Sequence, residues 1–135
     1  LALDLPLEKL IRPTIVPSLY LINSGPIPPN PAELLGSDKM AGLLSSLKNQ
    51  FDFILIDTPP ILTVTDAQIV GKLVDGLVLV VQAGKTPRDA LVQTRELIDL
   101  LKLRTFGVVV NGLNLDSHGY YYRHYYRHYY REYRG

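Results

Sequence analysis

The sequence predicts an α/β fold, with an open, doubly wound and mostly parallel sheet. Two observations lead to this prediction. Three continuous apolar runs, rich in β-branched residues, occupy 53–56, 77–81 and 106–110, and such runs are typical of strands that are buried on both faces. Segments with helical spacing of apolar residues separate these runs, and this alternation favours parallel strands joined by right-handed crossovers. The 135 residues fit one small domain or part of a larger one.

Little regular structure is expected in the first 31 residues, which hold seven of the ten prolines. Apolar spacing predicts a short helix over 7–11, and weak alternation predicts a strand over 19–23. The stretch 25–31 excludes both a helix and a central strand, because its prolines remove backbone donors and fix the backbone.

The regular part of the chain is expected over 32–113. Ser37 and Asp38 predict a helix N-cap. The apolar residues on the face of that helix are Met40, Leu43, Leu44 and Leu47. A second helix is expected over 66–74, with Ile69, Val70 and Leu73 turned inward. Thr86 and Pro87 open a longer helix, with the proline at its first position. The residues expected on its buried face are Leu91, Val92, Leu97, Ile98 and Leu101.

The net charge of +1 is unevenly distributed. Residues 1–119 carry ten Lys and Arg against twelve Asp and Glu, a balance of −2, whereas 120–135 carry four Arg and one Glu, a balance of +3. The basic tail is therefore suited to dock on an acidic body, its own or a neighbour's. The absence of cysteine fits a reducing compartment, and no apolar run approaches the roughly 20 residues that span a bilayer. Because the first residue is Leu, we expect the chain to begin inside a longer protein.

The tail, residues 120–135, repeats Tyr-Tyr-Arg-His and holds eight of the nine tyrosines. An exposed row of phenols reduces solubility and so indicates a use. Three uses are open: a surface for nucleic acid, an interface anchor, or a set of phosphate acceptors. We expect the tail to be mostly disordered, because it contains no aliphatic core residue.

Polar side chains end the three predicted strands, at Asp57, Gln82 and Asn111. In open α/β sheets, ligands bind outside the carboxyl ends of the strands. Asp57, at the tip of a buried strand, is suited to hold Mg²⁺ directly or through water, and equally well suited to cap a turn or the next helix. Asn111 is able to read an adenine edge, although its position before Gly112 favours a role in a turn. A second carboxylate, at Asp66, is interpreted as a helix cap in preference to a group that orients a phosphate-bound water.

Several stretches together resemble the bacterial protein-tyrosine kinases, the P-loop autokinases of exopolysaccharide and capsule synthesis. Residues 51–60, Phe-Asp-Phe-Ile-Leu-Ile-Asp-Thr-Pro-Pro, followed by Thr-Asp-Ala at 65–67, resemble their Walker B segment. Residues 24–35 resemble a stretch that precedes it in that family. Residues 107–111, Gly-Val-Val-Val-Asn, resemble the last core strand, whose terminal Asn lies near the adenine in related ATPases. The tail resembles the family's autophosphorylated tyrosine cluster.

This resemblance implies a P-loop NTPase-like fold of which only part is present, with 1–119 as the C-terminal part of a kinase domain and 120–135 as a tyrosine-rich tail. It implies ATP and Mg²⁺ as cofactors, Asp57 as the catalytic and metal-binding residue, and Asn111 as a cofactor-binding residue. The implied phosphate acceptors are Tyr121, Tyr122, Tyr125, Tyr126, Tyr129, Tyr130 and Tyr133.

The partners that the resemblance implies are other copies of the chain, a membrane module and a phosphatase. The tail of one subunit is expected to enter the site of its neighbour in a ring-like homo-oligomer. A transmembrane chain-length regulator, fused or separate, would activate the kinase and hold it in the cytoplasm at the inner face of the plasma membrane. A cognate tyrosine phosphatase would reverse the reaction.

The sequence departs from the family's pattern in one important respect. The Gly-rich Walker A loop with its phosphate-binding Lys does not occur in it, nor does the Walker A′ motif. We therefore expect the 135 residues alone to be inactive, and two apolar faces to be left uncovered. The alternative function is a positioning ATPase of the partition or septum type whose Arg/Tyr tail binds nucleic acid or membrane. Eight tyrosines with few lysines favour chemistry on the hydroxyl, so no nucleic acid is expected.

Overall fold

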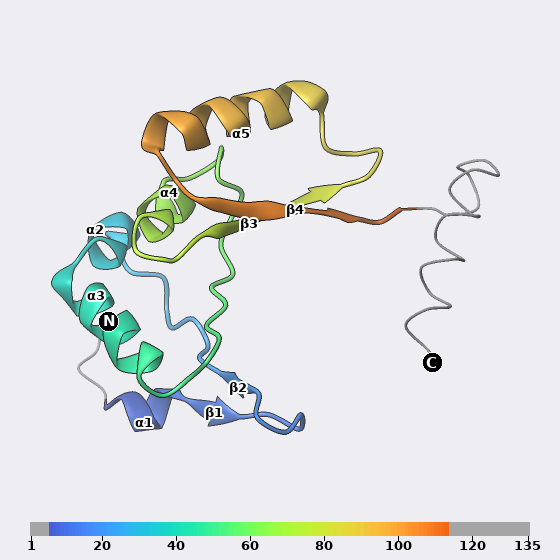
Figure 1. Ribbon diagram of the computed structural model, residues 1–135. Helices are drawn as coiled ribbons and strands as arrows, with labels where there is room; N and C mark the ends of the chain where they lie inside the picture. Colours follow the sequence, from blue (N-terminus) through green and yellow to red (C-terminus); the bar gives the residue numbers. More distant parts are fainter. Residues whose placement is uncertain (1–5, 114–135) are drawn as a thin grey trace, which may run out of the picture.

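A two-stranded parallel sheet and the helix that joins its strands form one unit of the computed structural model, which describes residues 6–113 (Figure 1). Strand β3 spans Leu77–Gln82, helix α5 spans Arg88–Leu101, and strand β4 spans Thr105–Asn111. In Figure 1, α5 runs above the two strands. The strands pair in parallel, so the predicted α/β class and the parallel crossover are confirmed.

Three further helices pack beside this unit. Helix α2 spans Pro31–Leu35, α3 spans Asp38–Lys48 and α4 spans Asp66–Gly71, and α2 contacts both of the others. Ser37 joins the first two: its Oγ donates to the carbonyl of Leu34 at 2.7 Å and accepts from the amide of Met40 at 3.4 Å. The predicted N-cap is therefore confirmed. The buried apolar side chains are Met40, Leu44, Leu47, Ala67, Val70, Ile98 and Leu103.

The N-terminal part forms a short helix and a small antiparallel hairpin. Helix α1 spans Leu7–Leu10, and strands β1, Arg12–Pro13, and β2, Tyr20–Leu21, pair with each other. The ring of Tyr20 meets that of Phe51 edge-on, with their centroids 5.4 Å apart. This aromatic contact links the hairpin to the segment that follows α3.

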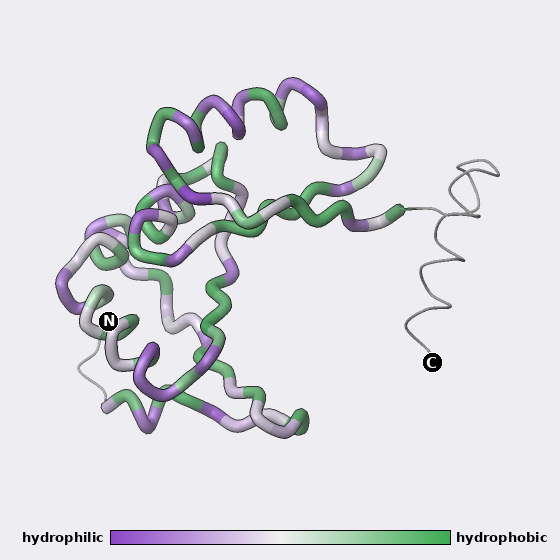
Figure 2. Tube along the Cα trace, viewed as in Figure 1, coloured by the Kyte–Doolittle hydropathy of each residue, from purple (hydrophilic) through white to green (hydrophobic). Residues whose placement is uncertain are grey.

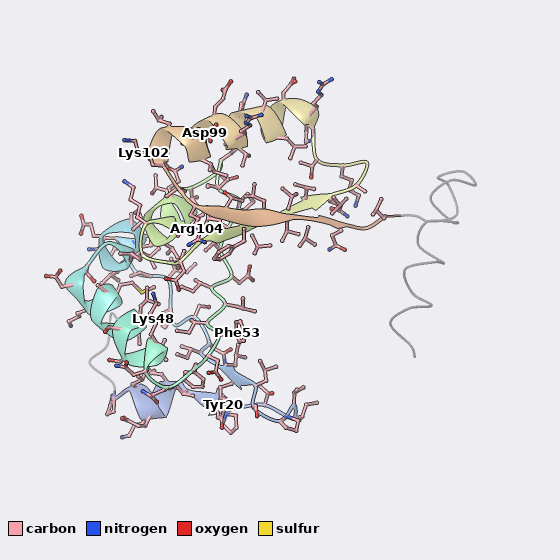
Figure 3. The ribbon with its side chains drawn as sticks, viewed as in Figure 1. Tyr20, Lys48, Phe53, Asp99, Lys102 and Arg104 are labelled. Carbon is pink, nitrogen blue, oxygen red and sulfur yellow. The ribbon has the colours of Figure 1, made fainter. Side chains whose placement is uncertain are left out.

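The apolar run at 53–56 is not a strand, which corrects the sequence prediction. It lies in the irregular connection between α3 and α4, with Phe53 and Leu55 exposed to 89% and 93% (Figure 3). A strand needs a neighbour that pairs its N–H and C=O groups. Within residues 6–113 the only paired strands are β1 with β2 and β3 with β4, so this run has no such neighbour.

The prediction that the strands are buried on both faces of the sheet is also wrong. Along β3 the exposure alternates, and Val78 and Val80 remain 54% and 67% exposed, while every residue of β4 is exposed. Figure 2 shows the two strands as a largely hydrophobic stretch. The expectation of uncovered apolar surface thus holds for this sheet. The buried face of α5 is narrower than predicted, since Leu91 and Val92 are exposed.

Helix boundaries differ from the predictions by small amounts. Helix α4 ends at Gly71 and not at 74; Gly71 is buried, and a Cβ there would lie 3.1 Å from a methyl group of Leu103. Pro87 is the N-cap of α5 and not its first residue. Asp66 is the first residue of α4 and makes no capping hydrogen bond, so its interpretation as a cap is wrong. Over residues 6–113, no helix combines the length and apolarity needed to cross a membrane.

Candidate active site

The carboxyl edge of the β3–β4 sheet brings together two of the three polar residues that the sequence places at strand ends. Gln82 and Asn111 are direct partners in the parallel register. The amide of Ala83 donates to the carbonyl of Asn111 at 2.9 Å, which extends the pairing one residue beyond β3. Both side chains are exposed, as expected for groups at the ligand-binding end of an α/β sheet.

The turn after β3 is closed by hydrogen bonds to the backbone of Gln82. Its N–H donates to Oγ1 of Thr86 at 2.9 Å, and its carbonyl accepts from the amides of Lys85 and Thr86 at 3.2 and 2.9 Å. Gly84 has a φ of +70°, which a glycine adopts without strain. Sequence reasoning assigned Thr86 only to the start of a helix. The signal for this turn was present in the Gly-Lys-Thr-Pro run.

The turn after β4 is closed by Asn111 itself. Its side-chain Oδ1 accepts from the amide of Gly112 at 2.8 Å, and Gly112 has a φ of +69°. The turn role that the position before Gly112 favours is therefore confirmed for the side-chain oxygen. Nδ2 has no partner within residues 6–113, so it is free to donate a hydrogen bond to a ligand.

Asp57 belongs to neither of these hydrogen-bonded turns and lies in the irregular segment before α4. Its side chain is exposed and makes no hydrogen bond or ion pair with any residue in 6–113. A free carboxylate fits Mg²⁺, which usually takes one or two protein carboxylates and completes its octahedron with water and substrate phosphates. Among the described residues there is no cluster of three or more metal-ligating side chains.

Two of the three comparisons with known proteins find similar proteins, and both find tyrosine kinases. No family model matches the chain. Tyrosine-protein kinase YwqD of Bacillus subtilis is 41% identical over 118 residues, which cover 85% of this chain and 50% of that protein. The kinase domain of Escherichia coli tyrosine kinase ETK matches with a TM-score of 0.72 and 29% identity, over 85% of this chain and 47% of that structure. The chimerical protein CapA2B2 matches with a TM-score of 0.74 and 38% identity, over 78% of this chain and 46% of that structure.

The chain is homologous to bacterial tyrosine-protein kinases over part of their length. Its α/β fold is that of the P-loop kinase domains in this family, as the resemblance in the sequence implied. The chain spans about half the length of YwqD, 50%, and of the putative tyrosine-protein kinase CapB of Staphylococcus aureus, 49%.

The seven tyrosines interpreted as phosphate acceptors lie in 120–135, outside the described residues. An open groove of about 260 Å³ lies between α4 and α5, lined by Thr65, Gln68, Ile69, Lys72 and Leu101. This groove shares no residue with the carboxyl edge of the sheet.

Proposed function

We propose that this chain is part of an ATP-dependent protein-tyrosine autokinase that regulates the synthesis and export of exopolysaccharide or capsule. Residues 1–119 would form the C-terminal part of the kinase domain, and 120–135 the tail that is phosphorylated. The observation that carries the proposal is the match, in sequence and in fold, to tyrosine kinases over about four-fifths of the chain.

The proposed roles follow from the chemistry of the exposed groups. Asp57 would hold Mg²⁺, which when bound neutralises charge on the transferring phosphoryl group. Asn111 would contact the adenine through its free Nδ2, while its oxygen keeps the turn at Gly112 in place. Both groups act as fixed ligands, so neither has to gain or lose a proton.

The chain lacks a Walker A loop, so nothing in it is known to cradle the β- and γ-phosphates. We infer that the complete kinase combines this chain with a segment that carries this loop and fills the open side of the sheet. The 135 residues alone would then be inactive. That complete polypeptide would be the full-length kinase.

The acceptor tyrosines would be phosphorylated in trans, with the tail of one subunit at the site of the next in a ring. At neutral pH each phosphate adds roughly −1.5 to −2 charges. Two phosphates per tail would therefore already bring the net charge of residues 120–135 from +3 to zero or below. Docking on the acidic body of a neighbour would weaken, and the ring would open. A transmembrane activator at the inner face of the plasma membrane and a cognate phosphatase would set the balance between the two states.

Mass spectrometry of the full-length kinase after incubation with ATP and Mg²⁺ tests this function. The expected result is phosphate on tyrosines in 120–135, absent from a sample incubated with a non-hydrolysable ATP analogue. ATP hydrolysis without phosphotyrosine would instead indicate a positioning ATPase. In that case a vesicle or single-stranded DNA binding assay would show which surface the tail recognises.

A further inference from the structure

The side chain of Gln82 takes no part in the turn that its backbone closes. The main-chain N–H and C=O of Gln82 bond to Lys85 and Thr86. Its carboxamide, in contrast, is exposed and has no hydrogen-bond partner among residues 6–113. A change of this side chain should therefore leave the turn intact.

The Gln82 side chain extends over the turn at Gly112. A Cβ placed on Gly112 would lie 3.5 Å from Cγ of Gln82 and 3.6 Å from its Nε2. Because Gln82 also pairs directly with Asn111 in the sheet, the two carboxamides are neighbours at the same edge. Because residue 112 is a glycine, no side chain there competes with Gln82 for this space.

The hydrogen-bonding groups that remain free match an adenine edge. Oδ1 of Asn111 is occupied by the Gly112 amide, so Asn111 contributes a donor, Nδ2. Gln82 contributes an acceptor, Oε1, and a second donor. Adenine presents an amino donor at N6 beside an acceptor at N7, whereas guanine presents an acceptor, O6, in place of the amino group. Because Nε2 lies on the Gly112 side of the carboxamide, Oε1 is the atom that faces the base in this orientation; it complements the N6 amino group and opposes O6.

We propose that Gln82 is a specificity-determining residue that, together with Asn111, selects adenine over guanine nucleotides. The inference rests on the proposed ATP-dependent function and extends it to one further side chain. A site that is built to hydrogen-bond a ligand group rejects analogues without that group, because its own polar atoms are then left unpaired. Gln82 positions the base and does not contact the transferring phosphoryl group.

The test compares three nucleotides on the full-length kinase: ATP, GTP and purine riboside triphosphate, which lacks the N6 amino group. The wild type should bind ATP more tightly than either of the others, by roughly ten- to a hundredfold. Gln82→Met keeps the length of the side chain and removes its polar atoms. It should weaken ATP binding by a similar factor. The affinity for purine riboside triphosphate should hardly change, because the analogue already lacks the contact that the variant removes.

Gln93→Met, at an exposed position on α5, is the matched control and should change none of the three affinities. Autophosphorylation at saturating ATP should be the same in Gln82→Met as in the wild type. The inference is overturned if Gln82→Met weakens the binding of ATP and of purine riboside triphosphate equally, if it changes neither affinity, or if it slows autophosphorylation at saturating ATP. If the wild type binds none of the three nucleotides, the proposed function fails and this inference fails with it.

Discussion

The side-chain oxygen of Asn111 accepts a hydrogen bond from the amide of Gly112 at 2.8 Å, while the nitrogen of the same carboxamide is free within residues 6–113. The oxygen of this carboxamide thus stabilises the turn, and its nitrogen is available to a ligand. The two roles can be separated by substitution, because aspartate keeps the acceptor oxygen and lacks the donor nitrogen.

Asn111→Asp should weaken ATP binding to the full-length kinase by roughly tenfold or more, in line with the value of a good base contact. Asn111→Ala should weaken it at least as much and should also loosen the turn. Isothermal titration with ATP gives the affinities, and turnover at saturating ATP should change little. An Asn111→Asp variant with wild-type affinity for ATP would show that Asn111 only stabilises the turn.

A second prediction concerns Asp57. Asp57→Asn replaces a free carboxylate with a neutral amide of the same shape, so Mg²⁺ would lose a charged ligand while the fold keeps all its contacts. Autophosphorylation of the full-length kinase, measured by radiolabelled ATP, should fall below detection with an unchanged circular dichroism spectrum. Asp52→Asn, at another exposed position in the same irregular segment, is the control and should keep its activity. Near wild-type labelling in Asp57→Asn would remove Asp57 from the site.

A third prediction concerns the link between α2 and α3. Ser37→Ala removes the N-cap of α3 and the bond to Leu34, and loss of such a cap costs about 1 kcal/mol. Amide hydrogen exchange in the first turn of α3 should then be about fivefold faster in the full-length kinase, since 1.4 kcal/mol corresponds to a factor of ten. Ser46→Ala, whose exposed hydroxyl bonds only to the carbonyl of Gly42, should leave that exchange unchanged. Equal effects of the two changes would contradict the capping role.

The uncovered sheet leads to a fourth prediction, for the 135-residue chain produced alone. Exposed apolar side chains along the strands, such as Val80 at 67%, favour association and the binding of hydrophobic dyes. The chain alone should sediment as oligomers, and Val80→Lys should shift it toward monomer. Gln93→Lys adds the same charge on α5 and should not. A wild-type chain that stays monomeric at high concentration, with no dye binding, would argue against an open sheet.

The sequence predicts well those elements that are stabilised by local interactions. Ser37 caps α3 as expected, and β3 and β4 match their apolar runs to within one residue at each end, because the connection through α5 brings them together. The run at 53–56 has the same composition, yet it forms no strand within residues 6–113, because strand formation depends on a partner that composition does not reveal. For the same reason Asn111 and Gln82 could be placed at one edge from sequence, whereas Asp57 could not.

The last prediction concerns the tyrosines of the tail. The seven acceptors Tyr121, Tyr122, Tyr125, Tyr126, Tyr129, Tyr130 and Tyr133 are close enough in sequence to replace one another. A single Tyr→Phe change should therefore alter total phosphotyrosine little. Changing all seven to Phe keeps the aromatic rings and removes every hydroxyl that could accept phosphate.

The seven-Phe variant of the full-length kinase should lose its phosphotyrosine signal and remain associated in the presence of ATP, because its tail stays basic. Analytical ultracentrifugation with and without ATP measures the association, and a wild-type sample that dissociates with ATP is the reference. Asp57→Asn is the matched control: it should also stay associated, with all its tyrosines intact. If the seven-Phe variant dissociates with ATP as the wild type does, tail phosphorylation does not control assembly. If wild-type tails carry no phosphate at any of the seven positions, the autokinase assignment is wrong.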